Sequence, residues 1–205
     1  MKRALELAKE LLKVLEEKKE ECVNVEQYEL FTLEPGEVFK VGNHDFIVLE
    51  QMEGQTAVIS KGFMAEDKQF DEETRDYNKS EIKRFIESEI QPVIESTVGA
   101  DNIVEHEVDL TSVDMQKEFE NCRCKVRLIT FDEARKYNDL VADKSLGDWW
   151  WTCTPWSAEE RGYKYSLAVV CPSGLIYDDY YHYDYGVRPF CILKSNIFVS
   201  KGGQK

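Results

Sequence analysis

The sequence predicts an α+β fold built from antiparallel sheets with two or more helices, preceded by an N-terminal helix. Strand-like segments separated by short turns occupy residues 37–60. A helical pattern follows over 79–90, and strand-like segments return through the last third of the chain. This order of elements favours an α+β domain whose terminal segments meet in one antiparallel sheet.

Composition and charge narrow the classes of partner. The chain has 205 residues, 42% of them hydrophobic, and a net charge of −14 with a pI near 4.7. Such a surface repels phosphate backbones and anionic lipid, so we expect no nucleic-acid binding and no membrane insertion. The N-terminal segment carries charges throughout and does not resemble a secretory signal. We therefore expect cytoplasmic synthesis and reduced cysteines.

The sequence divides into an N-terminal helix with a connector over 1–35 and a domain over 36–201. Residues 3–20 have a helical pattern, and 21–34 form the connector. One interpretation is an amphipathic helix docked on its own domain; the other is a short helix that forms a homo-oligomer. The apolar stripe consists of Leu5, Ala8, Leu12 and Leu15.

The first half of the domain contains a β-meander and then two helices. The strands EVFKVG, FIVLEQ and TAVISK are separated by NHD and EGQ, which is typical of hairpin turns. Asn78 is predicted to cap the helix over 79–90, with Glu81 completing a capping box. Gly99 is predicted to end a second short helix.

In the second half of the domain, helical and strand-like segments alternate. Residues 113–121, VDMQKEFEN, look helical, whereas CRCKVRLI looks extended. Thr130 and Glu133 form another capping box, which predicts a helix through about residue 137. The strands YSLAVV and LIYDD, joined by a CPSG turn, then VRPFCIL and NIFVS complete the prediction.

The cysteines and histidines suggest two sites, neither with a strong motif. Cys122-x-Cys124 has closer spacing than a usual structural zinc pair, with only His44 and His106 as partners. A packed strand explains the pair equally well, since both thiols share one face, and we expect no metal and no cofactor.

A nucleophilic cysteine is the other hypothesis. Cys171 or Cys191 would need a base such as His182, yet no sequence motif holds such a pair together. Buried apolar cysteines explain both positions more simply.

The stretch Tyr177 to Tyr185, YDDYYHYDY, is the most informative part of the chain. Tyr, Asp and His alone fill nine consecutive positions, and calcium loops, which alternate ligands with glycine and end in Glu, differ from it. Exposed tyrosines supply rigid amphipathic contact area, as in antibody loops. Tyr, Asp, His and Asn are the four residues whose codons consist of any base, then A, then a pyrimidine. If Asn codons were copied with errors at their template adenines, the products would include codons for Tyr, Asp and His.

The Trp-rich segment DWWWTCTPW, the hairpin, this tract and the closing GVRPFCILKSNIFVS together resemble the variable proteins of diversity-generating retroelements. The resemblance covers roughly residues 36–200. It implies a C-type lectin fold, related to that of formylglycine-generating enzymes, and a variable region at about 149–190 rewritten by adenine-directed mutagenic reverse transcription. The calcium-dependent sugar-binding motifs of animal C-type lectins are not present, so no such binding is expected.

The resemblance also implies which residues vary and which support them. Nine contiguous positions are more than one strand face offers, so part of the tract is expected to be loop. Gly186, Arg188 and Pro189 would be scaffold, with Arg188 anchoring the final strand through buried hydrogen bonds. The tract supplies the main candidates, and Trp150, Tyr163 and Tyr165 are weaker ones. The main candidates are Tyr177, Asp178, Asp179, Tyr180, Tyr181, His182, Tyr183, Asp184 and Tyr185.

The implied function is therefore a non-enzymatic, diversified binding protein for an unknown protein or cell-surface ligand, located on a virion or a cell surface after synthesis. Trp149 and Trp151 share one strand face and Trp150 takes the other, so we expect one face in the core and the other exposed. Two alternatives remain. One is an enzyme related to formylglycine-generating proteins with a reactive Cys171 or Cys191. The other is a structural subunit of a phage particle or surface assembly.

Overall fold

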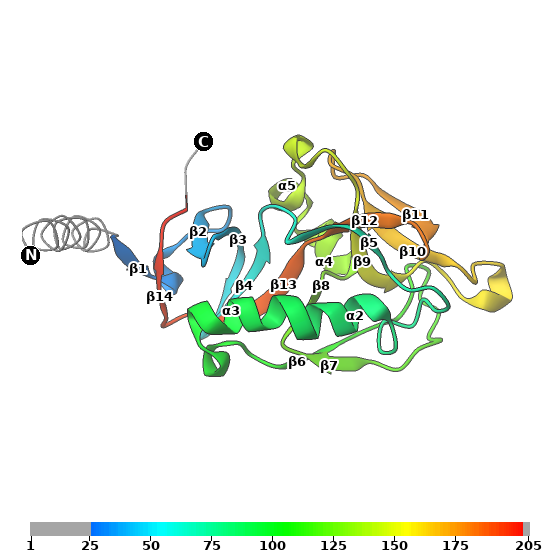
Figure 1. The fold of residues 1–205 in the computed structure, drawn as a ribbon, viewed down its shortest axis with the longest axis horizontal. Helices are drawn as coiled ribbons and strands as arrows, with labels where there is room; N and C mark the ends of the chain where they lie inside the picture. Colours follow the sequence, from blue (N-terminus) through cyan, green and yellow to red (C-terminus); the bar gives the residue numbers. More distant parts are fainter. Residues whose placement is uncertain (1–25, 203–205) are drawn as a thin grey trace, which may run out of the picture.

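The computed structural model describes residues 26–202 and has the predicted α+β architecture, with mostly antiparallel sheets (Figure 1). The predicted N-terminal helix and Cys22 lie outside the described residues. Within the described range, no helix has both the length and the apolar composition that a membrane crossing requires. Two five-stranded sheets and a long helical segment make up most of this structure.

The first sheet joins early and late parts of the chain, as predicted. Its strand order is β2-β3-β4-β13-β8, and every neighbouring pair is antiparallel. The strands are β2 (Val38–Val41), β3 (His44–Met52), β4 (Gln55–Ser60), β13 (Pro189–Lys194) and β8 (Val126–Leu128).

The second sheet carries the tyrosine tract on two of its strands, one at the edge and one inside the sheet. Its order is β11-β10-β9-β12-β5, antiparallel except where β12 meets β9 in parallel at Gly186 and Trp150. The strands are β11 (Ile176–Tyr180), β10 (Ser166–Val170), β9 (Trp150–Pro155), β12 (Asp184–Val187) and β5 (Ala65–Gln69).

Two short ribbons complete the strands. One pairs β1 (Gln27–Glu29) with β14 (Phe198–Ser200), and the other pairs β6 (His106–Val108) with β7 (Cys122–Cys124). Leu30 follows β1 and is fully buried, so part of the predicted connector packs into the domain. The chain ends of the described region therefore lie side by side (Figure 1).

The predicted helices merge into one segment that runs alongside the first sheet (Figure 1). It consists of α2 (Glu81–Phe85), a π-helical turn (Ile86–Ile90) and α3 (Gln91–Val98). Isoleucines at every fourth position face the core, because residues four apart share a helix face. These are Ile82, Ile86, Ile90 and Ile94.

The predicted end of this segment is confirmed, but its predicted N-cap is wrong. Gly99 has a φ of 86° directly after the last helical residue, a conformation that glycine adopts readily. Ser80, not Asn78, is the N-cap, and its hydroxyl accepts a hydrogen bond from Lys83 N. Asp71 accepts from Glu81 N at 2.9 Å, which satisfies another free N–H of the first turn.

The helix predicted over 113–121 is wrong. Met115 has a φ of 66°, which ends any helical path there. Glu118 instead forms an ion pair at 2.5 Å with the buried Arg75 guanidinium. A contact between positions far apart in sequence therefore overrides the local helical pattern.

The second capping box is confirmed. Helix α4 (Phe131–Lys136) starts after Thr130, whose hydroxyl accepts from Glu133 N while the Glu133 carboxylate accepts from Thr130 N. A short helix, α5 (Asn138–Val141), follows and packs near the second sheet.

The two sheets share one continuous segment, because β12 of the second sheet leads directly into β13 of the first. Arg188 lies between these strands and is fully buried. Its Nε donates to the carbonyl of Ser60 at 3.0 Å, and its Nη1 donates to that of Val141 at 2.7 Å. The guanidinium also lies 4.7 Å from the ring centroid of Trp150. Arg188 thus anchors the final strands through buried hydrogen bonds, as predicted.

Gly186 has no room for a side chain. A Cβ built there would lie 2.4 Å from the Phe63 ring. We expect Gly186→Ala to lower the free energy of unfolding by about 1–3 kcal/mol, because overpacking forces the neighbours to shift. Gly62→Ala is the matched control, since its Cβ would meet nothing within 4 Å. Urea unfolding of both variants checks this, and equal effects would contradict it.

Candidate recognition surface

The tyrosine tract divides into a strand, a turn and a second strand. Residues 177–180 belong to β11, 181–183 form the turn and 184–185 begin β12. Tyr181 holds the turn through its backbone: its N donates to Tyr165 O and its O accepts from Phe70 N, each at 3.0 Å. The expectation that part of the tract is loop is therefore confirmed.

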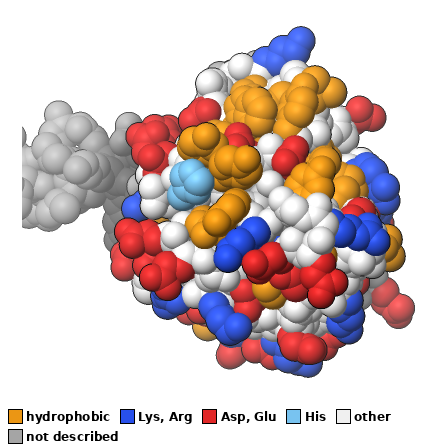
Figure 2. Space-filling model, turned by 90° about the vertical axis from the view of Figure 1, so that its right-hand side faces the viewer, with side chains coloured by type: hydrophobic (Ala, Val, Ile, Leu, Met, Phe, Trp, Pro, Cys, Tyr) orange, Lys and Arg blue, Asp and Glu red, His pale blue; other side chains and the backbone are white. Residues whose placement is uncertain are grey.

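Three tyrosines of the tract are well exposed. Tyr177, Tyr180 and Tyr183 have exposed fractions of 44–46%. Figure 2 shows apolar and tyrosine side chains gathered on this end of the molecule, with acidic groups and a histidine among them. The exposed polar members of the tract are Asp178, His182 and Asp184.

Consecutive residues of β11 are exposed. Alternate side chains of a strand point to opposite faces, so Tyr177 and Asp178 point to different sides of the sheet. Both are exposed, so neither face of β11 is covered by core at these two positions.

Tyr181 and Trp150 do not belong to this surface. Tyr181 is only 6% exposed, and its ring packs in the same core cluster as Phe70 and Trp151. Trp150 is fully buried in a second cluster with Val170 and Ile176, on the other side of the sheet. The expectation that one face of the Trp segment is exposed is wrong, because both faces of β9 are covered by core.

Half-buried aromatics support the exposed ones. Trp149 stacks on Tyr177 with ring centroids 5.2 Å apart and on Tyr185 at 5.9 Å. Tyr185 also contacts Trp151 edge-on at 4.9 Å, which ties this layer to the core. Trp149 was not among the predicted binding residues, because sequence alternation alone does not distinguish it from Trp151.

Asp179 is fixed within this layer and does not point freely into solvent. Its carboxylate accepts from Tyr185 Oη at 2.5 Å and from Tyr180 N at 2.8 Å. Burial and the neighbouring Asp179 carboxylate raise the pKa of Tyr185 above its ordinary value. Tyr185 therefore stays a neutral donor at physiological pH, and this hydrogen bond links a side chain of β12 to a side chain of β11.

Two weaker candidates lie beside the tract. Tyr165 is exposed, and its ring lies 6.1 Å from Tyr180 and 5.8 Å from Tyr181. Tyr163 is also exposed, in the loop between β9 and β10. We name the exposed residues of the tract, together with Tyr165, the recognition surface: Tyr165, Tyr177, Asp178, Tyr180, His182, Tyr183 and Asp184.

The cysteine and histidine candidates are separate from this surface. Cys122 and Cys124 both point into the core from β7, while Arg123 between them is exposed. Within residues 26–202, no three or more His, Cys, Asp or Glu side chains are arranged to hold a metal ion. His106 Nε2 instead accepts from Arg127 Nε at 2.8 Å.

The two cysteines considered as nucleophiles have different surroundings. Burial raises the pKa of the Cys191 thiol to about 12, which keeps it protonated. Cys171 Sγ lies 2.9 Å from Ser173 Oγ. Among the described residues, no hydrogen bond joins either thiol to His182.

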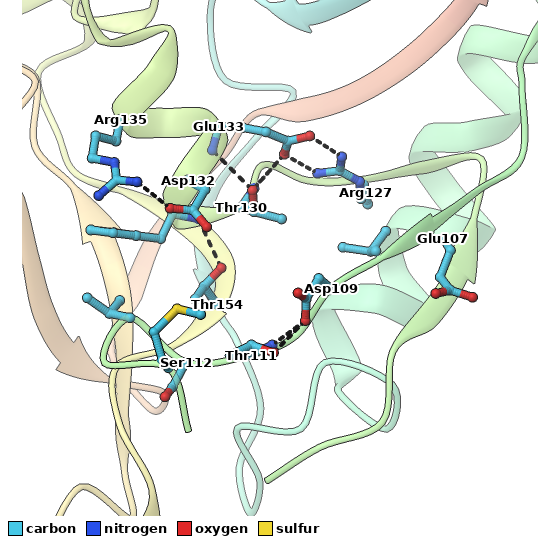
Figure 3. A pocket seen from close by; sticks show the side chains of 14 residues that line it. Glu107, Asp109, Thr111, Ser112, Arg127, Thr130, Asp132, Glu133, Arg135 and Thr154 are labelled. Atoms are coloured by element: carbon cyan, nitrogen blue, oxygen red, sulfur yellow. Dashed lines mark hydrogen bonds and ion pairs between the residues drawn. The ribbon is translucent and has the colours of Figure 1, made fainter. Parts of the chain in front are cut away.

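A cavity of about 400 Å³ lies between β6, α4 and the loop after β6 (Figure 3), and the sequence did not predict it. The buried Arg127 at its wall pairs with both carboxylate oxygens of Glu133, at 2.6 and 2.7 Å. Burial alone would raise the pKa of Glu133, but the hydrogen bonds and charge of Arg127 outweigh it and lower that pKa. Arg127 and Glu133 neutralise each other, which assigns this pair a structural role.

No family model, no curated protein and no solved structure matches this chain.

The division between exposed and buried tyrosines is directly testable. Replacing Tyr177, Tyr180 and Tyr183 together by Ser is expected to change the free energy of unfolding by less than about 1.5 kcal/mol, because exposed side chains contribute little. Tyr181→Ser is expected to lower it by about 3 kcal/mol, because a buried ring is lost. Urea unfolding measures both. A triple variant less stable than the Tyr181 variant would contradict this assignment.

The ion pair of Arg127 and Glu133 predicts a pH-dependent stability difference. At pH 7, Glu133→Gln is expected to lower the free energy of unfolding by about 3 kcal/mol, because it leaves Arg127 buried without its countercharge. The pKa of Glu133 is lower in the folded protein than its ordinary value of 4.5. Its charge therefore stabilises the folded state fully above pH 4.5, and this contribution is lost as the pH falls through the folded-state pKa. The wild-type and variant curves should therefore converge below about pH 4.5. A difference that stays constant down to pH 3 would contradict this.

Proposed function

We propose that this protein is a non-enzymatic binding protein of C-type lectin fold, whose recognition surface is diversified by adenine-directed mutagenic reverse transcription. The paired early and late strands of the first sheet support this fold. The ligand would be a protein or a cell-surface molecule. The final location would be a virion or a cell surface.

One observation carries the proposal: six of the nine consecutive residues that share this codon form occupy exposed positions, and the residues directly after the tract are buried scaffold. Tyr177 and His182 point to solvent. Directly after the tract, Gly186 is closely packed against Phe63, and Arg188 is fully buried. Substitutions confined to the exposed positions would change the surface while leaving the core intact.

Aromatic contact supplies the chemistry of recognition. A tyrosine has only two side-chain torsions, so binding orders it at little entropic cost. The stacked layer beneath, with Trp149 and Tyr185, limits that cost further because it holds the exposed rings in place. The fully buried Cys191, whose pKa burial raises to about 12, favours this function over an enzyme that uses Cys191 as a reactive thiol.

The DNA around the coding sequence tests this proposal. We expect a reverse-transcriptase gene nearby and a near-copy of the codons for about 149–190 that differs at template adenines. Across related isolates, differences should fall on the exposed positions of the tract, and not on Gly186, Arg188 or the buried Trp150.

Two results would count against it. One is a locus without such a duplicate. The other is variation spread equally over exposed and buried positions, since that would leave the codon pattern without a functional cause.

A further inference from the structure

We propose that the recognition surface in its present sequence binds an arginine-bearing segment of a protein partner. This inference rests on the proposed binding function and specifies the ligand chemistry of the same surface. Three features carry it: unpaired carboxylates, exposed aromatic faces and the scarcity of basic side chains within the surface.

The first feature is free negative charge. Asp178 and Asp184 are both exposed; Asp178 lies within β11, and Asp184 directly follows the turn as the first residue of β12. Within residues 26–202, neither takes part in an ion pair or in a side-chain hydrogen bond. Asp179 is different, because its carboxylate already accepts hydrogen bonds from Tyr185 Oη and Tyr180 N. A cationic ligand would therefore not compete with a cationic side chain of the protein for these two carboxylates.

The second feature is the orientation of the rings. Tyr180 and Tyr183 are nearly parallel, with an interplanar angle of 6° and centroids 6.0 Å apart. Each has almost half of its side chain exposed. The face of a tyrosine ring attracts cations, and a planar guanidinium stacks on it. This pair therefore suits a flat cation better than a compact one.

The third feature is the local charge balance. Lys164 is the basic side chain that reaches the surface, 5.9 Å from the Tyr165 ring centroid, and Glu159 pairs with it at 3.4 Å. Lys68, on the adjacent β5, lies over the Phe85 ring instead. The surface thus presents carboxylates and ring faces with little internal positive charge, within a chain of net charge −14.

Arginine matches both kinds of group at once. Its guanidinium donates two parallel hydrogen bonds to a carboxylate while its plane stacks on an aromatic face. A lysine ammonium is a hydrated point charge that does neither in this way. An acidic ligand would meet repulsion from the same carboxylates. We therefore assign arginine, and not lysine, as the preferred contact.

Fluorescence anisotropy with labelled six-residue peptides of arginine, lysine or glutamate tests this on the full chain at low and moderate salt. We expect the arginine peptide to bind at least about threefold more tightly than the lysine peptide, and the glutamate peptide not to bind. Asp178→Asn with Asp184→Asn should weaken arginine binding by about tenfold. The triple variant Tyr177→Leu, Tyr180→Leu and Tyr183→Leu should weaken arginine binding similarly, because the ring faces are lost.

Glu53→Gln with Glu89→Gln is the matched control, because it removes the same charge from exposed positions elsewhere. We expect it to change arginine binding less than twofold. Equal weakening by both pairs of substitutions, or equal binding of arginine and lysine peptides, would overturn the proposal, since net charge alone would then explain binding. Thermal melting verifies that each variant folds. Such a failure would leave the diversified surface itself standing, because the DNA around the coding sequence tests that separately.

Discussion

The buried guanidinium of Arg188 is the constraint on which the rest of the structure depends. It sits where the chain passes from the second sheet into the first, and it binds carbonyl groups of β4 and α5. Its stacking on Trp150 adds a contact to β9. Burial lowers its pKa to about 10, yet it remains charged at physiological pH. One side chain thereby fixes the two sheets and α5 relative to each other, and with them the strand that leads out of the tyrosine tract.

The recognition surface follows from this anchoring. The chain leaves the edge strand β11, turns at Tyr181 and enters β12 on the far side of β9. Because Tyr181 is pinned by backbone and core contacts, the residues on either side of it are forced outward. Trp149 and Tyr185 form an aromatic base beneath them. Exposed aromatic area on a stiff frame suits a binding surface, because the side chains lose little conformational entropy when a ligand binds.

Local signals predicted much of the fold, and distant contacts decided the rest. The capping box at Thr130 and the helix end at Gly99 depend on neighbouring residues, so the sequence was sufficient for them. The helix over 113–121 failed because the buried Arg75, far away in sequence, captures Glu118. The exposure of Trp150 was wrong for a similar reason: alternation assumes one solvent face, whereas core covers both faces of β9. Within the tract, composition alone did not separate the buried Tyr181 from its exposed neighbours.

Hydroxyl-radical footprinting read residue by residue by mass spectrometry tests the central claim most directly. That claim is that the tract faces solvent on a fixed frame. The account predicts fast oxidation of Tyr177, Tyr180 and Tyr183, and slow oxidation of Tyr181, comparable with the fully buried Tyr77. Equal rates at all four tract tyrosines, or protection of all of them in the isolated protein, would contradict it.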